Sequence, residues 1–118
     1  MPILIIQTSS KTSEYHIENS SKISIGSSLD CDIVLHSQHI SYYHSVIILM
    51  VDDYDFYWVI KDGHLRKQYS ASDRGTFVNN VKIQKITRLH HLDFIKFDDI
   101  SIFPYIIFVI TKKHDVLD

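Results

Sequence analysis

Three short motifs carry the side chains in this sequence that are suited to chemistry. They are Gly26-Ser27, a Ser-x-x-His at Ser41 and His44, and Arg74-Gly75-Thr76 with Asn79 three residues beyond. Hydroxyl groups, an arginine and a loop-bracing histidine suit the binding of a phosphate group, because charge-assisted hydrogen bonds to phosphate oxygens are strong. The motifs are far apart in sequence, so this chemistry needs a fold that brings them together.

The third motif leads into a predicted β-hairpin. Alternating apolar runs at residues 77–78 and 81–83 flank Asn79-Asn80. Asparagine tolerates the positive φ that a tight two-residue hairpin turn demands. Gly75 is one of only three glycines in the chain, which indicates that the backbone turns sharply just before the hairpin.

The other apolar segments are short and are separated by turn-forming residues. No window has a sustained helical period with caps, so the pattern favours an all-β sandwich. Residues 46–51 are apolar throughout, and burial of both faces of that strand is expected. Because a sandwich gathers alternate loops at one end, the three motifs are expected to meet there. The expected strands outside the hairpin are 3–6, 15–17, 23–25, 32–35, 46–51, 56–60, 86–92, 94–97, 100–103 and 105–110.

Length and charge argue against several classes of protein. A chain of 118 residues forms one domain, which we expect at 1–111, followed by a C-terminal tail at 112–118. A net charge of -2 without a basic stripe argues against a duplex nucleic-acid binder. The chain lacks a signal-peptide pattern, and the run 105–110 is too short to span a bilayer of about 30 Å. The lone Cys31 fits a reducing compartment, so a soluble cytoplasmic protein is expected.

Six segments together resemble the forkhead-associated (FHA) domain family, over residues 23 to 108. Each segment is weak evidence alone, but the six occur in the family's order. They are Ile23-Ser24-Ile25-Gly26, Asp32-Ile33-Val34-Leu35, Ile40-Ser41-Tyr42-Tyr43-His44, Trp58-Val59-Ile60-Lys61-Asp62, Gly75-Thr76-Phe77-Val78-Asn79 and Leu92-Asp93-Phe94-Ile95-Lys96-Phe97.

The resemblance implies an eleven-stranded antiparallel β-sandwich whose apical loops bind phosphothreonine peptides. It assigns the phosphate hydrogen bond to Ser41, a structural role behind the loops to His44, and a peptide contact beside the phosphothreonine to Arg74. It also implies a non-enzymatic recognition module without a cofactor, of a kind often attached to other domains. The implied phosphopeptide-binding residues are Ser27, Ser41, Tyr42, Ser72, Asp73 and Arg74, and the structural motif residues are Gly26, His44, Gly75, Thr76 and Asn79.

The sequence departs from the family's pattern at the phosphate site. The arginine of the family's Gly-Arg, its chief phosphate ligand, is Ser27 here, and the basic residue after the motif serine is Tyr42. Asp73 adds a negative charge, and the Asn-Gly of the hairpin is Asn79-Asn80. A charge-assisted hydrogen bond is worth about 1.5–3 kcal/mol, so the lost arginine costs roughly ten- to a hundredfold in affinity. The candidates to replace it are Arg74, Arg66, Lys67 and His39.

Three other interpretations stay open from the residues. The histidines at 36, 39, 44, 90 and 91 could be imagined as metal ligands, but their spacing favours loop histidines and no metal. Ser41, His44 and Asp62 or Asp93 could form a hydrolase triad, although no nucleophile-elbow motif is present. A degenerate FHA domain could instead bind a partner without phosphate, or serve as a structural module in which exposed strand edges pair between copies.

Overall fold

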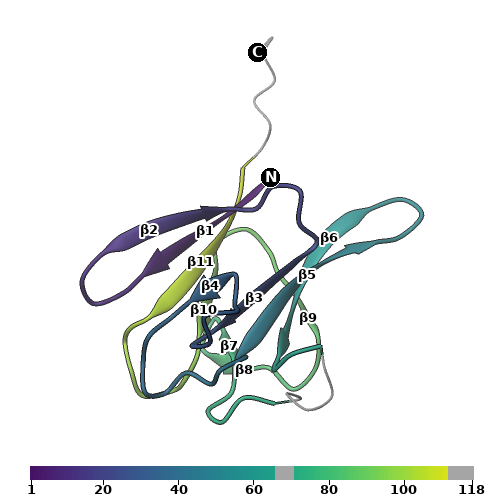
Figure 1. Cartoon of the computed structure of the whole chain (residues 1–118). Coiled ribbons are helices and arrows are strands. Elements are labelled where there is room, and N and C mark those ends of the chain that lie inside the picture. Colours follow the sequence, from purple (N-terminus) through teal and green to yellow (C-terminus); the bar gives the residue numbers. More distant parts are fainter. Residues whose placement is uncertain (66–70, 112–118) are drawn as a thin grey trace.

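The computed structural model describes residues 1–65 and 71–111, which form two β-sheets packed face to face (Figure 1). The first sheet has the strand order β2-β1-β11-β10-β7-β8, and the second has the order β4-β3-β5-β6-β9. The described residues contain no helix that is long and apolar enough to cross a membrane. The strands are β1 (Pro2–Gln7), β2 (Thr12–His16), β3 (Lys22–Gly26), β4 (Ile33–Val34), β5 (Ser45–Val51), β6 (Phe56–Asp62), β7 (Phe77–Val78), β8 (Val81–Lys82), β9 (Thr87–Arg88), β10 (Asp93–Lys96) and β11 (Tyr105–Ile110).

The all-β sandwich with eleven strands is confirmed, with one departure from antiparallel pairing. Strand β4 runs parallel to β3, with Ile25 paired to Ile33, whereas the other paired strands are antiparallel. Strand β1 pairs along its whole length with β11, from Pro2 with Ile110 to Gln7 with Tyr105. Both ends of the described chain are therefore held in one sheet. The predicted tail at 112–118 lies outside the described residues.

The core lies between the two sheets and follows the period of two that a strand imposes. Alternate residues of β1 are buried, and the same alternation appears in β10 and β11. These side chains meet those of β3, β5 and β6 in one apolar cluster. Its fully buried members include Leu4, Ile23, Ile25, Ile47, Ile60, Ile95, Ile106 and Phe108.

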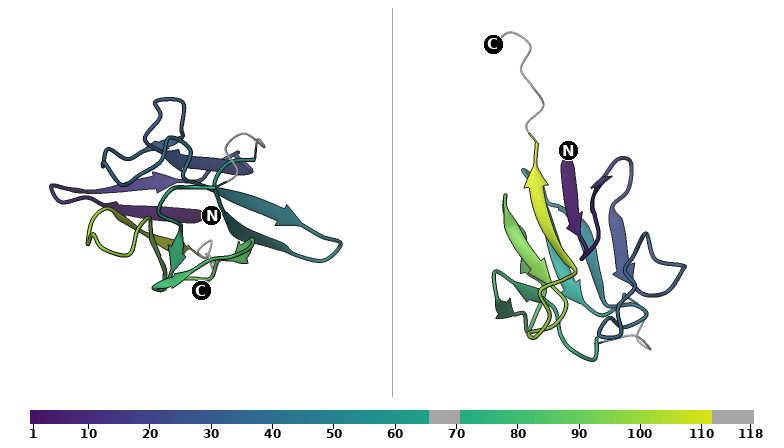
Figure 2. Two further views of the ribbon diagram at one scale, coloured as in Figure 1. Left: turned by 90° about the horizontal axis from the view of Figure 1, so that it is seen from below. Right: turned by 90° about the vertical axis from the view of Figure 1, so that its left-hand side faces the viewer.

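The expectation that both faces of residues 46–51 are covered is wrong for the second half of the strand. Val46 and Ile47 are buried, whereas Met50 and Val51 are exposed. The reason is visible in Figures 1 and 2, where the β5–β6 hairpin continues beyond the edge of the sandwich. An apolar run therefore marks a strand here without marking its burial.

Two expected strands differ from the structure. The run 86–92 keeps only the two-residue strand β9, which pairs with Val59 and Ile60 of β6. The run 100–103 forms no strand, because the Asp98 carboxylate accepts the backbone N–H groups of Ile100 at 2.8 Å and Ser101 at 2.6 Å. A side chain that binds these groups locally holds the backbone in a turn and competes with strand pairing.

Candidate functional site

Three loops meet at the end of the sandwich opposite residue 1 and the end of strand β11 (Figures 1 and 2). Backbone hydrogen bonds join the first two, from Ser27 N–H to the Ser41 carbonyl oxygen at 3.1 Å and from Ser28 N–H to that of Tyr42 at 3.2 Å. The third loop joins them where Asp73 N–H donates to Ser41 Oγ at 2.9 Å. The structure thus brings together the three motifs singled out in the sequence.

His44 links two of these loops from the interior. Its Nδ1 accepts the N–H of Ser41 at 3.1 Å, so the ring proton is on Nε2, which donates to the Gly75 carbonyl oxygen at 2.7 Å. The ring is fully buried and packs edge-on against Phe97. Burial lowers the pKa of His44, although the Gly75 carbonyl and nearby carboxylates act in the opposite direction. His44 is therefore a neutral side chain that holds the loops in place.

Gly26 is required by the close approach of the second loop. A Cβ at this position would lie 2.0 Å from the Tyr42 carbonyl oxygen, which is far inside van der Waals contact. The neighbouring Cys31 is buried, and its thiol lies 3.2 Å from the same oxygen. Burial raises the pKa of this thiol, so Cys31 packs as a small apolar residue rather than a reactive nucleophile.

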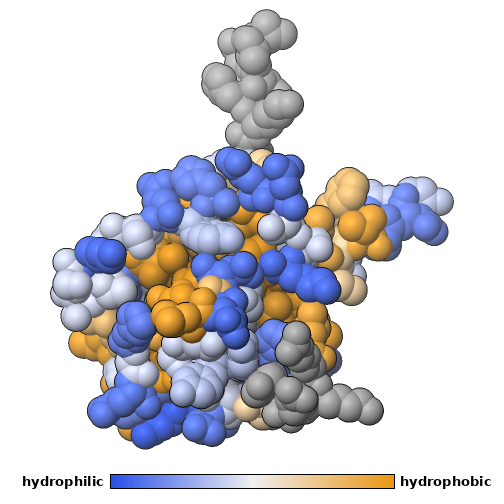
Figure 3. Space-filling model, viewed as in Figure 1, coloured by the Kyte–Doolittle hydropathy of each residue, from blue (hydrophilic) through white to orange (hydrophobic). Residues whose placement is uncertain are grey.

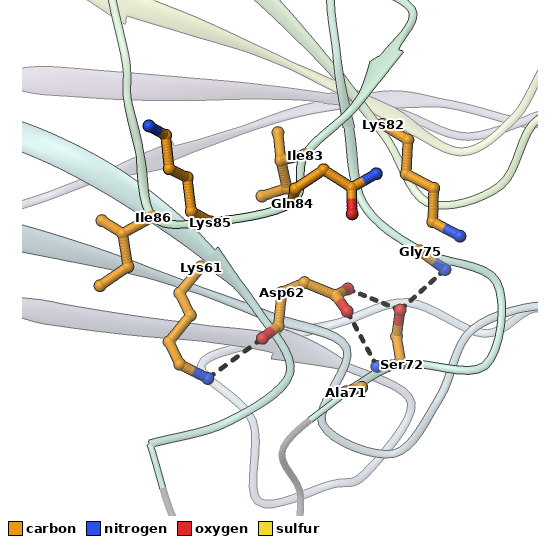
Figure 4. A pocket seen from close by; sticks show the side chains of 10 residues that line it. All are labelled: Lys61, Asp62, Ala71, Ser72, Gly75, Lys82, Ile83, Gln84, Lys85 and Ile86. Atoms are coloured by element: carbon orange, nitrogen blue, oxygen red, sulfur yellow. Dashed lines mark hydrogen bonds between the residues drawn. The ribbon is translucent and has the colours of Figure 1, made fainter.

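Asp62, at the end of β6, organises the third loop. Its Oδ1 accepts the hydroxyls of Ser72 at 2.6 Å and Thr76 at 2.7 Å, and its Oδ2 accepts Ser72 N–H at 3.1 Å. Ser72 Oγ in turn accepts Gly75 N–H at 2.9 Å, and Ser45 Oγ lies 2.6 Å from Thr76 Oγ1. Figure 4 shows the carboxylate of Asp62 facing Ser72. Sequence reasoning did not find this role, because its partners lie 10 and 14 positions away.

The predicted hairpin turn has the expected backbone. Asn79 and Asn80 have φ values of 52° and 69°, and Gly75 before them has 91°. The Asn79 side chain donates to Asp93 Oδ1 at 2.9 Å and accepts Phe94 N–H at 2.9 Å. Asn79 thus fixes the hairpin against β10. The Asp93 carboxylate is hydrogen-bonded to Asn79 and to the N–H of His90.

The residues expected to bind the phosphopeptide differ in how they are presented. Tyr42, Asp73 and Arg74 are exposed, and Ser27 and Ser41 are partly exposed. The hydroxyl of Ser72 is different, because it donates inward to Asp62. His39 is partly buried, and it adds a small effect to the hydrogen bonds from Ser101 and Ile100 that lower the pKa of the Asp98 carboxyl against the effect of burial. Arg66 and Lys67, two of the suggested replacements for the missing arginine, lie outside the described residues.

The geometry does not favour the hydrolase and metal interpretations. Both ring nitrogens of His44 are engaged, with Ser41 N–H and the Gly75 carbonyl, so the ring is not placed to take a proton from the Ser41 hydroxyl. Asp62 and Asp93 are hydrogen-bonded to other groups. Within residues 1–65 and 71–111, no three His, Cys, Asp or Glu side chains are grouped so as to hold a metal ion.

Comparisons with known proteins agree with this geometry. A family model described as the FHA domain matches residues 23–98, and no curated protein sequence matches the chain. Among solved structures, the Slr1951 protein from Synechocystis sp. is 22% identical with a TM-score of 0.78, covering 95% of this chain and 100% of that one. The FHA domain of the CT664 protein from Chlamydia trachomatis is 22% identical with a TM-score of 0.73, covering 94% and 98%.

A third similar structure contains a bound peptide. It is the MEK1 FHA domain in complex with a HOP1 phosphothreonine peptide, which is 21% identical with a TM-score of 0.64 and covers 92% of this chain and 97% of that one. At such identities the structural likeness shows the fold alone.

Proposed function

Because the chain belongs to the FHA domain family, we propose that it recognises a partner protein carrying phosphothreonine. The phosphate binds at the junction of the three apical loops, and Ser41 donates a hydrogen bond to it. Arg74 contacts the peptide beside the phosphothreonine. The domain extends over residues 1–111 and acts as a recognition module rather than a catalyst.

The observation that carries this proposal is the state of the Ser41 hydroxyl. Its oxygen already accepts Asp73 N–H, so the position of the side chain is fixed. Its own proton finds no acceptor in the described parts of the chain, and the side chain is partly exposed. A fixed donor at the meeting point of three loops suits an anionic oxygen from a ligand, because little ordering is needed on binding.

Arg74 supplies the positive charge in this proposal. It follows Asp73 directly, it is exposed, and it makes no ion pair with the described residues. A guanidinium group on this loop is therefore free to reach an anion bound at Ser41, where one charge-assisted hydrogen bond would contribute about 1.5–3 kcal/mol. Ser27, where the family has its arginine, adds a neutral hydroxyl. We expect binding that is weak but dependent on phosphate.

A second candidate function is recognition of a partner without phosphate. The observation that favours it is Asp73, whose exposed carboxylate lies on the same loop and would repel a dianionic phosphate. The same apical loops would then bind a neutral or basic segment of the partner.

NMR titration of the isotope-labelled protein separates these candidates. The ligands are a degenerate phosphothreonine peptide pool and the same pool without phosphate. Phosphothreonine recognition predicts shifts confined to Ser27, Ser41 and the loop Ser72 to Arg74, seen only with the phosphorylated pool. Ser41→Ala should abolish these shifts, whereas the control Ser20→Ala, at an exposed serine next to Met1 and away from the apical loops, should retain them.

Restoring the family's arginine tests the alternative. If the wild-type protein shows no shifts but Ser27→Arg does, the pocket is intact but dormant, and recognition without phosphate becomes the better account. If Ser41→Ala binds as tightly as the wild type, the phosphate does not bind at Ser41 and the proposal fails.

A further inference from the structure

The β5–β6 hairpin carries large apolar side chains away from the core. It projects from the sandwich in Figure 1, and Figure 3 shows apolar residues gathered on it. Val51 is 61% exposed, Phe56 70% and Tyr54 96%. A group of exposed apolar side chains on such a projection is typical of an interaction surface.

The turn at the end of this hairpin is held in one shape by its own side chains. The Asp52 carboxylate accepts the N–H groups of Tyr54 at 3.0 Å and Asp55 at 2.9 Å. The Asp55 carboxylate accepts Phe56 N–H at 2.8 Å and lies 3.5 Å from the Arg88 guanidinium. The carboxylates of Asp52 and Asp55, two of the three in this turn, are thus hydrogen-bonded within the molecule. Asp53, the third, is exposed and directly precedes Tyr54 in the chain.

A fixed turn of this kind binds at low entropic cost. Tyrosine has few rotatable bonds for its contact area, and the backbone that carries Tyr54 is already ordered. The surface that would receive the turn must accept an aromatic ring and a negative charge together. It needs apolar side chains next to unpaired cations.

Such a surface lies at the other end of strand β6. A cavity of about 500 Å³ is lined there by Lys61, Lys82 and Lys85 together with Ile83 and Ile86. Figure 4 shows the lysine and isoleucine side chains that line it, with Asp62 and Ser72. Lys61 Nζ donates to the carbonyl oxygens of Asp62 and His64. In the described part of the chain Lys82 and Lys85 form no ion pair, and Asp62 is bound to Ser72 and Thr76.

The turn and the cavity cannot meet within one molecule. Phe56 and Asp62 are the two ends of β6, six residues apart, which corresponds to roughly 20 Å along an extended strand. We propose that the Asp53–Tyr54 turn of one molecule binds in the lysine-lined cavity of a second copy. The Tyr54 ring packs against Ile83 and Ile86. The side chains of Lys82 and Lys85 point to opposite sides of the cavity in Figure 4, so the Asp53 carboxylate faces one of them while the other adds positive charge to the rim.

This contact uses two different surfaces, so it is head-to-tail. A head-to-tail contact whose surfaces lie at opposite ends of a molecule builds open chains rather than a closed dimer. One turn in one cavity is a small interface, so the association is weak and depends on concentration. The cavity shares Ser72 and Gly75 with the third apical loop, but Ser41 takes no part in the contact and no peptide is needed, so association can be measured separately from phosphothreonine binding.

Sedimentation velocity of the full chain without ligand tests the proposal. The sedimentation coefficient is expected to rise with protein concentration up to about 1 mM, and to rise less in high salt, because salt screens the charges. Asp53→Lys with Tyr54→Ala, on the turn, should remain monomeric, as should Lys82→Glu with Lys85→Glu in the cavity. The controls Asp99→Lys with Leu29→Ala and Lys11→Glu with Lys22→Glu change exposed residues elsewhere and should associate like the wild type.

Mixing the two deficient variants gives the sharper result. The turn variant keeps an intact cavity and the cavity variant keeps an intact turn, so an equal mixture should form a dimer and nothing larger. Thermal unfolding of each variant verifies that it is folded. The proposal is overturned if the wild-type protein stays monomeric throughout, if folded turn or cavity variants associate like the wild type, or if their mixture stays monomeric.

Discussion

The Nε2–H of His44 donates to the carbonyl oxygen of Gly75 over 2.7 Å, between residues 31 positions apart in sequence. This bond ties the loop that carries Ser41 to the loop that carries Arg74. The other ring nitrogen accepts Ser41 N–H, so a single buried side chain sets the distance between the two loops. His44 therefore links the stability of the fold to the geometry of the proposed binding site.

Replacing His44 with alanine should lower the free energy of unfolding by about 2–4 kcal/mol. The substitution removes two hydrogen bonds, leaves Ser41 N–H and the Gly75 carbonyl without partners, and opens a cavity beside Phe97. Urea denaturation measures the change. His36→Ala is the matched control, since His36 is exposed and should alter stability by less than about 0.5 kcal/mol. A loss for His44→Ala as small as that of the control would contradict the linking role.

Stability should also fall on mild acidification because of the same side chain. The pKa of His44 lies below its ordinary value of 6.5 in the folded protein, chiefly through burial. Between the lowered pKa and 6.5 the unfolded chain binds more protons, so the free energy of unfolding decreases as the pH falls through that window. The slope cannot exceed about 1.4 kcal/mol per pH unit for one group.

Urea midpoints of the wild type and His44→Gln between pH 7.5 and 5 measure this contribution. Glutamine cannot titrate, so the difference between the two curves isolates His44. Parallel curves over that range would mean that His44 has the same pKa in the folded and the unfolded protein.

Asp98 contributes to the free energy of unfolding in a separate, more acidic pH window. Its pKa is lowered because hydrogen bonds from Ile100 and Ser101 outweigh the effect of burial, so its contribution is lost as the pH falls below 3.8.

The fold was predictable where the sequence pattern and the packing coincide. Residues 105–110 and the Asn79-Asn80 turn match their predictions, because a short apolar run of strand length and residues that tolerate positive φ are local signals. The prediction of a strand at 100–103 was wrong for a local reason as well, because the Asp98 carboxylate accepts the backbone N–H groups of Ile100 and Ser101 that strand pairing would need. The exposure of Met50 and Val51 could not be predicted, because it depends on how far the hairpin extends past the other sheet.

The candidate site, like the fold, was predictable from the sequence only in part. A sandwich that gathers its loops at one end predicts that Ser41, His44 and Gly75 lie close together, and the structure shows them joined by hydrogen bonds. The role of Asp62 is not visible in the sequence, because an aspartate at the end of a strand is ordinary and its partners come from a distant loop. Ser72, which the resemblance places where the loop lines the phosphate pocket, donates its hydroxyl to Asp62.

Gly26→Ala should destabilise the protein although it adds only one methyl group. The new Cβ would lie 2.0 Å from the Tyr42 carbonyl oxygen, a backbone atom, so the Ser41–Tyr42 segment would have to move. That movement would strain the bonds from Ser27 N–H and Ser28 N–H to this segment, and we expect a loss of about 1–3 kcal/mol. Thermal unfolding measures it. The control Ser27→Ala, one residue along, should change little, and equal losses for both would show that the close approach is unimportant.

Asp62→Asn should loosen the loop from Ser72 to Thr76 without changing the size of the side chain. The carboxylate accepts three hydrogen bonds from this loop, two from hydroxyls and one from Ser72 N–H. An amide presents a single acceptor oxygen, so at least one hydroxyl or N–H would face an NH₂ group instead, at a cost of about 1–3 kcal/mol in unfolding free energy.

Hydrogen exchange shows where the Asp62→Asn protein has loosened. The backbone amides of Ser72 and Gly75 should exchange faster than in the wild type. The amides of the distant β1–β11 pairing should change only as far as the global free energy of unfolding changes. The isosteric change Asp99→Asn, at an exposed aspartate outside this network, is the control and should leave both readouts as in the wild type. Unchanged exchange at Ser72 and Gly75 in Asp62→Asn would mean that the loop keeps its shape without the carboxylate, and that its bonds to His44 and Ser41 are enough to hold it.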